Sequence, residues 1–207
     1  MRRIAGFLGI GAFVVFWLAS FILGAIRPDY SHVVNTISEL GAIGTPNAIL
    51  WNIIGFIVPG IFLAIAGGVI AKSVSLGKSK VITLACVLLV LAGLAVAGQG
   101  IFPAEMKDGI ANTASSSTRG HFLFSLLSGA AWALGALMLV RPMKRSPHWH
   151  GWHIVSATLV VLTVIISLSL RSVMPDGLAQ RTGDVFFFAW FLIMSVKLLK
   201  LESDKFQ

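Results

Sequence analysis

Residues 81–102 read VITLACVLLVLAGLAVAGQGIF, an apolar run without a charged residue. An α-helix rises about 1.5 Å per residue, so a run of this length crosses the hydrocarbon core of a bilayer, which is about 30 Å thick. The run also lacks the period-2 alternation that a strand of a membrane β-barrel shows. It therefore predicts a transmembrane helix.

Comparable apolar runs occur five more times along the chain. The first follows Met1, Arg2 and Arg3 and is longer than the apolar region of a signal peptide, which has about 7–15 residues. Pro59 lies inside the second run and is expected to kink that helix. The six predicted spans are residues 4–26, 48–71, 81–102, 121–140, 153–170 and 185–201. They predict an all-α, polytopic integral membrane protein, a six-transmembrane-helix bundle in which residues 1–207 form a single domain.

The composition agrees with a membrane protein. Hydrophobic residues make up 57% of the chain and charged residues only 12%, whereas a soluble domain carries about 25% charged residues. The single cysteine excludes a disulfide framework and a thiolate metal site within one chain.

Lys and Arg residues are divided unevenly between the two sides of the six spans. With the N-terminus inside, 11 of them lie on the inner side and five on the outer side. Because Lys and Arg are enriched in cytoplasmic loops, we expect a multi-pass protein of the cell membrane with both termini in the cytoplasm, N-in/C-in. The net charge of +8 then reflects topology and contact with anionic membrane lipid, and not a nucleic-acid partner.

The outer segments carry more chemically active side chains than simple connections need. Ionisable residues close to membrane depth are costly and are often functional. If the helix ends converge there, these side chains form one outward-facing polar site. The candidate residues are His32, Ser38, Glu39, Asp108, His121, Arg171, Asp176 and Arg181.

Three interpretations of these residues remain open. They are structural if they cap helices and pair locally, as Ser38 and Glu39 suit a helix start. They belong to a lipid hydrolase if His32 and His121, as metal ligands or bases, act with a carboxylate and a Ser38 nucleophile. They bind a lipid or a small solute if Arg171 and Arg181 receive its anionic group, beside Asp176. The sequence assigns no cofactor.

Two further patterns favour structural roles. The tract of residues 148–153, HWHGWH, is typical of an interfacial aromatic belt more than of a metal site. Small residues at a spacing of four, in Gly60-x3-Ala64-x3-Gly68 and Gly129-x3-Ala133, allow helices to approach closely. They favour packing within the bundle, with a homo-oligomer as the alternative.

The order of several short motifs resembles a known family. Tyr30-Ser31-His32 precedes Ile37-Ser38-Glu39-Leu40-Gly41, the third span ends in Gly100-Ile101-Phe102-Pro103, His121 opens the fourth span, and Gly177-Leu178-Ala179-Gln180-Arg181 precedes the last. This arrangement is similar to the domain of unknown function 998 family of six-span prokaryotic membrane proteins. It is more distantly similar to Frag1/DRAM/Sfk1-type membrane proteins. The resemblance implies a six-helix bundle but no reaction.

The sequence as a whole predicts a membrane protein that binds a lipid or an amphiphile at an outward-facing polar site. A membrane hydrolase that depends on a metal or on a His/carboxylate pair is one alternative. A structural or partner-binding membrane protein is the other.

Overall fold

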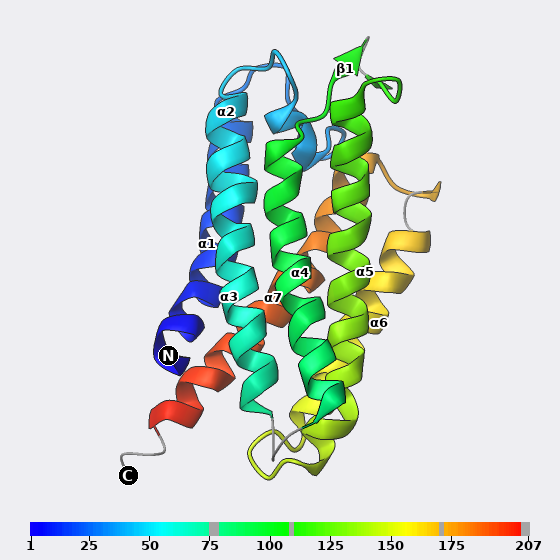
Figure 1. Ribbon diagram of the computed structural model, residues 1–207. Coiled ribbons are helices and arrows are strands. Elements are labelled where there is room, and N and C mark those ends of the chain that lie inside the picture. Colours follow the sequence, from blue (N-terminus) through cyan, green and yellow to red (C-terminus); the bar gives the residue numbers. More distant parts are fainter. Residues whose placement is uncertain (75–78, 108–109, 170–171, 204–207) are drawn as a thin grey trace.

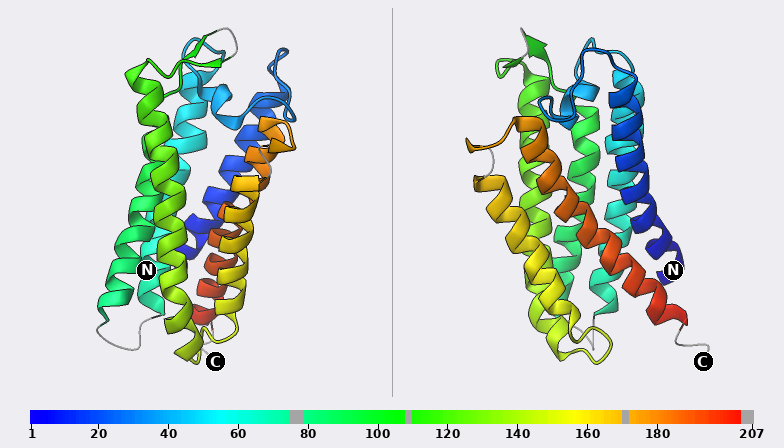
Figure 2. Two further views of the ribbon diagram at one scale, coloured as in Figure 1. Left: turned by 90° about the vertical axis from the view of Figure 1, so that its right-hand side faces the viewer. Right: turned by 180° about the vertical axis from the view of Figure 1, so that it is seen from behind.

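Six long helical segments form an elongated bundle in the computed structural model, which describes residues 1–74, 79–107, 110–169 and 172–203 (Figure 1). The start of α1 and the end of α7 lie toward the same end of the bundle (Figures 1 and 2). The helices are α1 (Arg2–Ala25), α2 (Ala48–Trp51), α3 (Val58–Ser73), α4 (Lys80–Ile101), α5 (Ser116–Arg145), α6 (Trp152–Ser169) and α7 (Asp176–Ser203). Two shorter elements are the 3₁₀ helix η1 (Ile37–Gly41) and the π-helix η2 (Asn52–Ile57), which joins α2 to α3.

The apolar helices confirm the predicted all-α membrane bundle. Four of the described helical segments are long and apolar enough to cross a membrane, and a shorter apolar helix covers Trp152–Ser167. These four segments are Arg2–Ala25, Ala48–Ser73, Lys80–Ile101 and Ser116–Arg145. Large apolar side chains such as Phe21, Leu126 and Ile165 remain exposed on the outside of the bundle, as expected where lipid is the solvent.

Two helices extend beyond the predicted spans because polar residues continue them. The fourth span was expected at 121–140, but α5 covers Ser116–Arg145. The last span was expected at 185–201, but α7 begins at Asp176. The first N–H groups of a helix have no partner within the helix itself. At the start of α7, the N–H groups of Gly177 and Leu178 donate instead to the carbonyls of Val34 and Val33, which stabilises the first turn. Arg181 and Asp184 therefore lie on a helix and not in a connection.

The turn that precedes Pro59 widens into the π-helix η2. Proline has no N–H to donate and its ring crowds the carbonyl four residues earlier, so the regular α-helical pattern is interrupted there. Within this π-helix, Asn52 donates from Nδ2 to the carbonyl of Gly41, 2.9 Å away. The interruption expected from Pro59 thus takes the form of a π-helical turn tied to η1.

Helices α3 and α4 approach each other closely. A Cβ atom at Gly93 would overlap the backbone nitrogen of Ala64, and one at Gly60 would overlap that of Ala97. The small residues of α3 therefore contact α4 of the same chain, as predicted for packing within the bundle. Gly129 of α5 has no heavy atom within 4 Å of an added Cβ.

The two glycines give a matched test of this packing. We expect Gly93→Ala to lower the free energy of unfolding by about 1–3 kcal/mol because the backbones must separate. Gly129→Ala should leave it unchanged or raise it by up to about 1 kcal/mol, since alanine favours a helix and meets nothing there. Thermal unfolding in detergent measures both variants. Equal effects of the two substitutions would contradict the close approach of α3 and α4.

Candidate functional site

The end of the bundle opposite the start of α1 and the end of α7, called the distal end, carries residues 26–47, residues 102–107 and 110–115, and the start of α7 (Figure 2). The antiparallel strands β1 (Met106–Lys107) and β2 (Ile110–Ala111) form a short hairpin at this end. Most of the candidate residues predicted from the sequence belong to these segments. Three local arrangements contain all of those that the structure describes except Asp176.

Arg181 holds the first distal segment against α7. Its side chain is buried, with 7% of the residue exposed. One terminal nitrogen donates to the carbonyls of Asn35, 2.8 Å away, and of Gly177, 3.0 Å away. The other donates to the hydroxyl of Tyr30 and lies 3.3 Å from Nδ1 of His32. The guanidinium is thus bonded by groups from both segments, which offsets much of the cost of burying its charge.

His32 contacts Arg181 as a neutral imidazole. A guanidinium only donates hydrogen bonds, so Nδ1 of His32 is the acceptor and the ring proton lies on Nε2. Burial and the positive charge of Arg181 lower the pKa of His32 below its ordinary value of 6.5. Burial also raises the pKa of Tyr30.

Glu39 and Ser38 belong to a helix cap. Oε1 of Glu39 accepts hydrogen bonds from the backbone N–H and the hydroxyl of Thr36, at 2.8 and 2.9 Å. These contacts form a capping box at the start of η1. The hydroxyl of Ser38 lies 3.1 Å from that of Thr36. Arg27 donates to the backbone carbonyl of Glu39. It also forms an ion pair with Asp29, which lowers the pKa of the exposed Asp29 carboxyl.

His121 closes the end of α4 from the first turns of α5. It is buried, and its Nδ1 lies 3.0 Å from the carbonyl of Gln99 and 3.1 Å from that of Phe102. Because both partners are acceptors, Nδ1 carries the proton. The ring also packs edge-on against Phe56. Orphan carbonyls at a helix end need such donors, so His121 has a structural function here.

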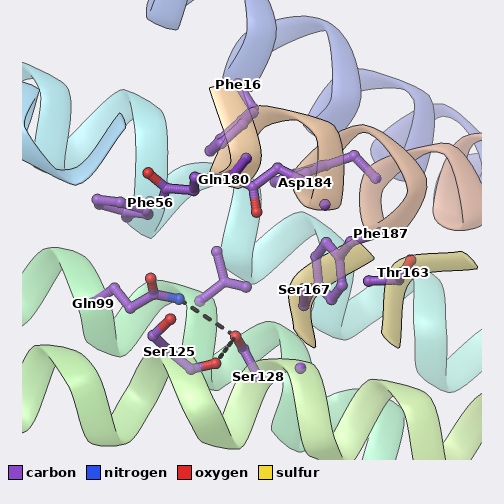
Figure 3. Close-up of a pocket in the computed structure, with 15 residues that line it drawn as sticks. Phe16, Phe56, Gln99, Ser125, Ser128, Thr163, Ser167, Gln180, Asp184 and Phe187 are labelled. Carbon is purple, nitrogen blue, oxygen red and sulfur yellow. Dashed lines mark hydrogen bonds between the residues drawn. The ribbon is translucent and has the colours of Figure 1, made fainter. Parts of the chain in front are cut away.

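A polar cavity of about 170 Å³ lies deeper in the distal half of the bundle. Gln180 and Asp184 project into it from α7, opposite Gln99 of α4 and Ser125 and Ser128 of α5, and α6 closes a third side (Figure 3). The lining residues are Phe16, Phe56, Val96, Gln99, Ser125, Ser128, Gly129, Thr163, Ser167, Ala179, Gln180, Gly183, Asp184, Phe187 and Phe188.

Hydrogen bonds within the described chain connect several residues of the cavity wall. Ser128 donates to the carbonyl of Ser125 at 2.8 Å and lies 3.5 Å from Nε2 of Gln99, which is at the limit of a hydrogen bond. Gln180 uses Oε1 to accept from the backbone N–H of Ile37, 2.8 Å away. Gln180 therefore connects the cavity wall to the distal segment that Arg181 holds.

The comparison with known families agrees with this architecture. A family model described as a protein of unknown function (DUF998) matches residues 10–197, which includes parts of all six long helical segments. The chain belongs to the DUF998 family. No curated protein and no solved structure matches this DUF998 protein. The more distant similarity to Frag1/DRAM/Sfk1-type proteins stays a prediction.

The structure places the predicted site residues of this DUF998 protein in separate arrangements. Arg181 and His32 are in contact, Ser38 and Glu39 cap η1, and His121 caps α4. Asp176 is exposed in the first turn of α7, and Asp108 and Arg171 lie outside the described residues. In the part of the chain that is described, no group of three or more His, Cys, Asp and Glu side chains gathers as metal ligands would. A metal site at His32 and His121 stays a prediction.

The sequence signalled the cavity only weakly. Gln99 was recognisable as a strongly polar side chain inside a span. The spacing of Gln180, Gly183, Asp184 and Phe187 places them on one face of a helix. That pattern was hidden because the last helix was expected to begin after Asp184.

The tract of residues 148–153 also differs from the expected aromatic belt. Trp149 is fully buried, and its Nε1 donates to the carbonyl of Ser73 at the end of α3, 3.3 Å away. It thus closes a helix end in the way that His121 does. This tryptophan therefore packs inside the bundle, and the interfacial belt stays a prediction for the rest of the tract.

Removing Arg181 tests the attachment of the first distal segment to α7. We expect Arg181→Ala to lower the free energy of unfolding by about 1.5–3 kcal/mol, because bonds to a charged donor are lost. Backbone amides of residues 33–37 and 177–178 should exchange faster with deuterium. The control is Arg119→Ala, an exposed residue that, within the described part of the chain, donates to the nearby carbonyl of Ala114. Unchanged exchange in Arg181→Ala would contradict this role of the arginine.

Acid should weaken the same attachment through His32. Because its pKa is lowered in the folded protein, the unfolded chain binds more protons, and stability falls as the pH drops below about 6.5. His32→Asn keeps an acceptor near Nδ1 but does not titrate. We therefore expect the melting temperature of the wild type to fall more steeply than that of His32→Asn between about pH 7.5 and about pH 5.5. Parallel curves would exclude this contribution of His32.

Proposed function

We propose that this protein binds the polar group of an amphiphile, such as a membrane lipid, in the cavity between α4, α5, α6 and α7. The observation that carries the proposal is the pair of polar walls that face each other across the cavity in an otherwise apolar bundle. Gln180 and Asp184 line one wall, and Gln99, Ser125 and Ser128 line the other. No hydrogen bond within the described chain uses Oε1 of Gln99 or Nε2 of Gln180. A polar group that is removed from water is costly unless it finds a hydrogen-bond partner, and a bound polar group supplies one.

The position of the cavity supports a ligand that enters from the membrane or its surface. Gln99 lies in the last turn of α4 and Ser167 close to the end of α6, so the cavity begins near the distal end. Phe16 and Phe187 extend its lining toward the apolar middle of the bundle. An amphiphile has the same order of groups, a polar head followed by an apolar chain.

We further propose that the distal end faces away from the cytoplasm in the cell membrane. Basic residues gather at the end that carries the termini, among them Arg2 and Arg3 of α1, Lys72 of α3 and Lys144 and Arg145 of α5. Cytoplasmic ends of membrane helices are enriched in Lys and Arg. The cavity would then serve an outer-leaflet or external ligand.

A structural role is the second candidate. It is favoured by the bond of His121 to the end of α4 and by the contacts of Arg181, which join separate segments of this chain, and by the local helix cap of Glu39. The hydrolase alternative has less support. The described residues that line the cavity include serines and one carboxylate but no histidine, which is the usual base for a serine nucleophile.

Lipid that remains bound during purification tests the proposal. We expect native mass spectrometry of protein extracted in lauryldimethylamine oxide to show a bound amphiphile, with occupancy at least about fivefold lower in Gln99→Leu, which removes one or two neutral hydrogen bonds. The control is Thr83→Ala on the same helix, at the end that carries the termini. Circular dichroism confirms that each variant is folded.

Ser128→Ala provides a second variant on the same wall if Gln99→Leu does not fold. Equal occupancy in the wild type and in the folded cavity variants would exclude amphiphile binding in this cavity. The structural role would then be the better account.

A further inference from the structure

We infer that an acyl lipid reaches the cavity from the bilayer, through an opening between α5 and α6. This route rests on the proposed function, because it requires that the cavity holds an amphiphile. It adds the source of that amphiphile, which is the hydrocarbon region of the membrane and not the water above it.

Helix α6 is attached to α7 at more than one level. Toward the distal end, a Cβ atom at Gly183 would lie 3.3 Å from Oγ of Ser167. Farther along the bundle, Trp190 donates a hydrogen bond from Nε1 to Oγ of Ser156, 2.8 Å away. The two helices therefore form a packed pair on one side of the cavity.

Helix α5 is attached to α4 in a similar way. A Cβ atom at Gly98 of α4 would overlap the ring of Phe124, and one at Gly135 of α5 would lie 3.0 Å from Cγ of Leu89. Helices α5 and α6 follow each other in the chain, and they diverge toward the distal end (Figures 1 and 2). The α5–α6 side is thus a boundary between two packed pairs of helices.

Small residues line the cavity where α5 and α6 diverge. They are Ser125 and Gly129 of α5 and Thr163 and Ser167 of α6 (Figure 3). Both serines are exposed, so the cavity wall lies at the surface of the bundle there. Small residues in membrane helices usually let a neighbouring helix approach closely, yet in the described part of the chain no heavy atom lies within 4 Å of a Cβ added at Gly129. An opening remains where such packing is usual.

The opening lies at the depth of the lipid hydrocarbon. The fourth predicted span begins at residue 121, so Ser125 and Gly129 lie about 6 and about 12 Å below its start, at about 1.5 Å per residue. One leaflet of the hydrocarbon core is about 15 Å thick. Leu126 of α5 and Val164 of α6, each next to a lining residue in the sequence, have exposed side chains. Acyl chains would therefore surround the opening.

The distal side of the cavity is covered by η1. The backbone N–H of Ile37 donates to Oε1 of Gln180, 2.8 Å away. Ile37 and Leu40 of this short helix are buried. A solute that arrived from the water at the distal end would have to displace this segment, whereas a lipid that enters between α5 and α6 would not.

The polar wall lies inside this opening. Gln99 is only 8% exposed and projects into the cavity (Figure 3), and within the described chain its Oε1 has no hydrogen bond. Ser128 lies beside it on α5. The polar part of a lipid can bond to these groups while its acyl chain still occupies the opening, so the lipid need not leave the membrane.

A reversible bridge across the opening tests this route. Ser125→Cys and Ser167→Cys are combined in a Cys86→Ala background and linked by a bifunctional methanethiosulfonate. The protein, purified with its bound lipid in lauryldimethylamine oxide, is mixed with a deuterated total lipid extract of the expression host. Native mass spectrometry follows the replacement of the bound lipid by its deuterated form. We expect the bridge to slow this replacement at least about tenfold, a rise of about 1.4 kcal/mol in the barrier. Reduction of the bridge should restore the rate.

Two phenylalanine variants test the same route without a bridge. Gly129→Phe places a ring in the space beside Gly129 and narrows the opening. The control is Ala130→Phe, since Ala130 is exposed on the same helix and is not part of the cavity lining. We expect slower replacement of the bound lipid in Gly129→Phe than in Ala130→Phe.

The outcomes separate the route from the proposed function. Equal rates in the bridged and the reduced protein, and in Gly129→Phe and Ala130→Phe, overturn entry between α5 and α6. Amphiphile binding stands in that case if Gln99→Leu still lowers the occupancy. A bound amphiphile without an acyl chain overturns the bilayer as its source. A folded wild type that retains no amphiphile overturns the proposed function, and the route with it.

Discussion

The distal half of the bundle depends on how Arg181 joins the first distal segment to α7. Its guanidinium bonds to Asn35, Tyr30 and Gly177 and touches His32, while carbonyls of Val33 and Val34 satisfy the first N–H groups of the helix. These contacts allow α7 to begin at Asp176. Without those two turns, Gln180 and Asp184 would not be helical and would not face Gln99 across a cavity. Arg181, which the sequence suggested as an anion-binding residue, thus holds two segments of the chain together.

The sequence predicted the bundle because apolar length is a local property. Each span could be read from its own residues, and the spans at 4–26, 48–71 and 81–102 differ from the observed helices only at their ends. The starts of α5 and α7 were missed because they depend on distant partners. The carbonyl of Val33 stabilises the N–H of Leu178, and His121 bonds to the end of α4. No local pattern shows such pairs.

The sequence directed attention to the outer segments and not to the cavity for a related reason. Histidine, arginine and glutamate attract attention because their chemistry is versatile, yet here they satisfy backbone groups at helix ends. The polar lining of the cavity consists largely of amides and hydroxyls, from Gln99 and Gln180 to Ser128 and Thr163, and these residues look unremarkable one at a time. Their significance comes from four helices that place them around one space. Membership of the DUF998 family is consistent with the bundle and leaves the ligand to be established by the chemistry of this cavity.

An experimental structure of the protein in lipid nanodiscs tests the central claim most directly. The account predicts density for a bound molecule whose polar end lies between Gln99 on one wall and Gln180 on the other, with its apolar part directed past Phe16 or Phe187. A cavity closed by direct contact between these two glutamines, with α7 packed against α4 and α5, would contradict it.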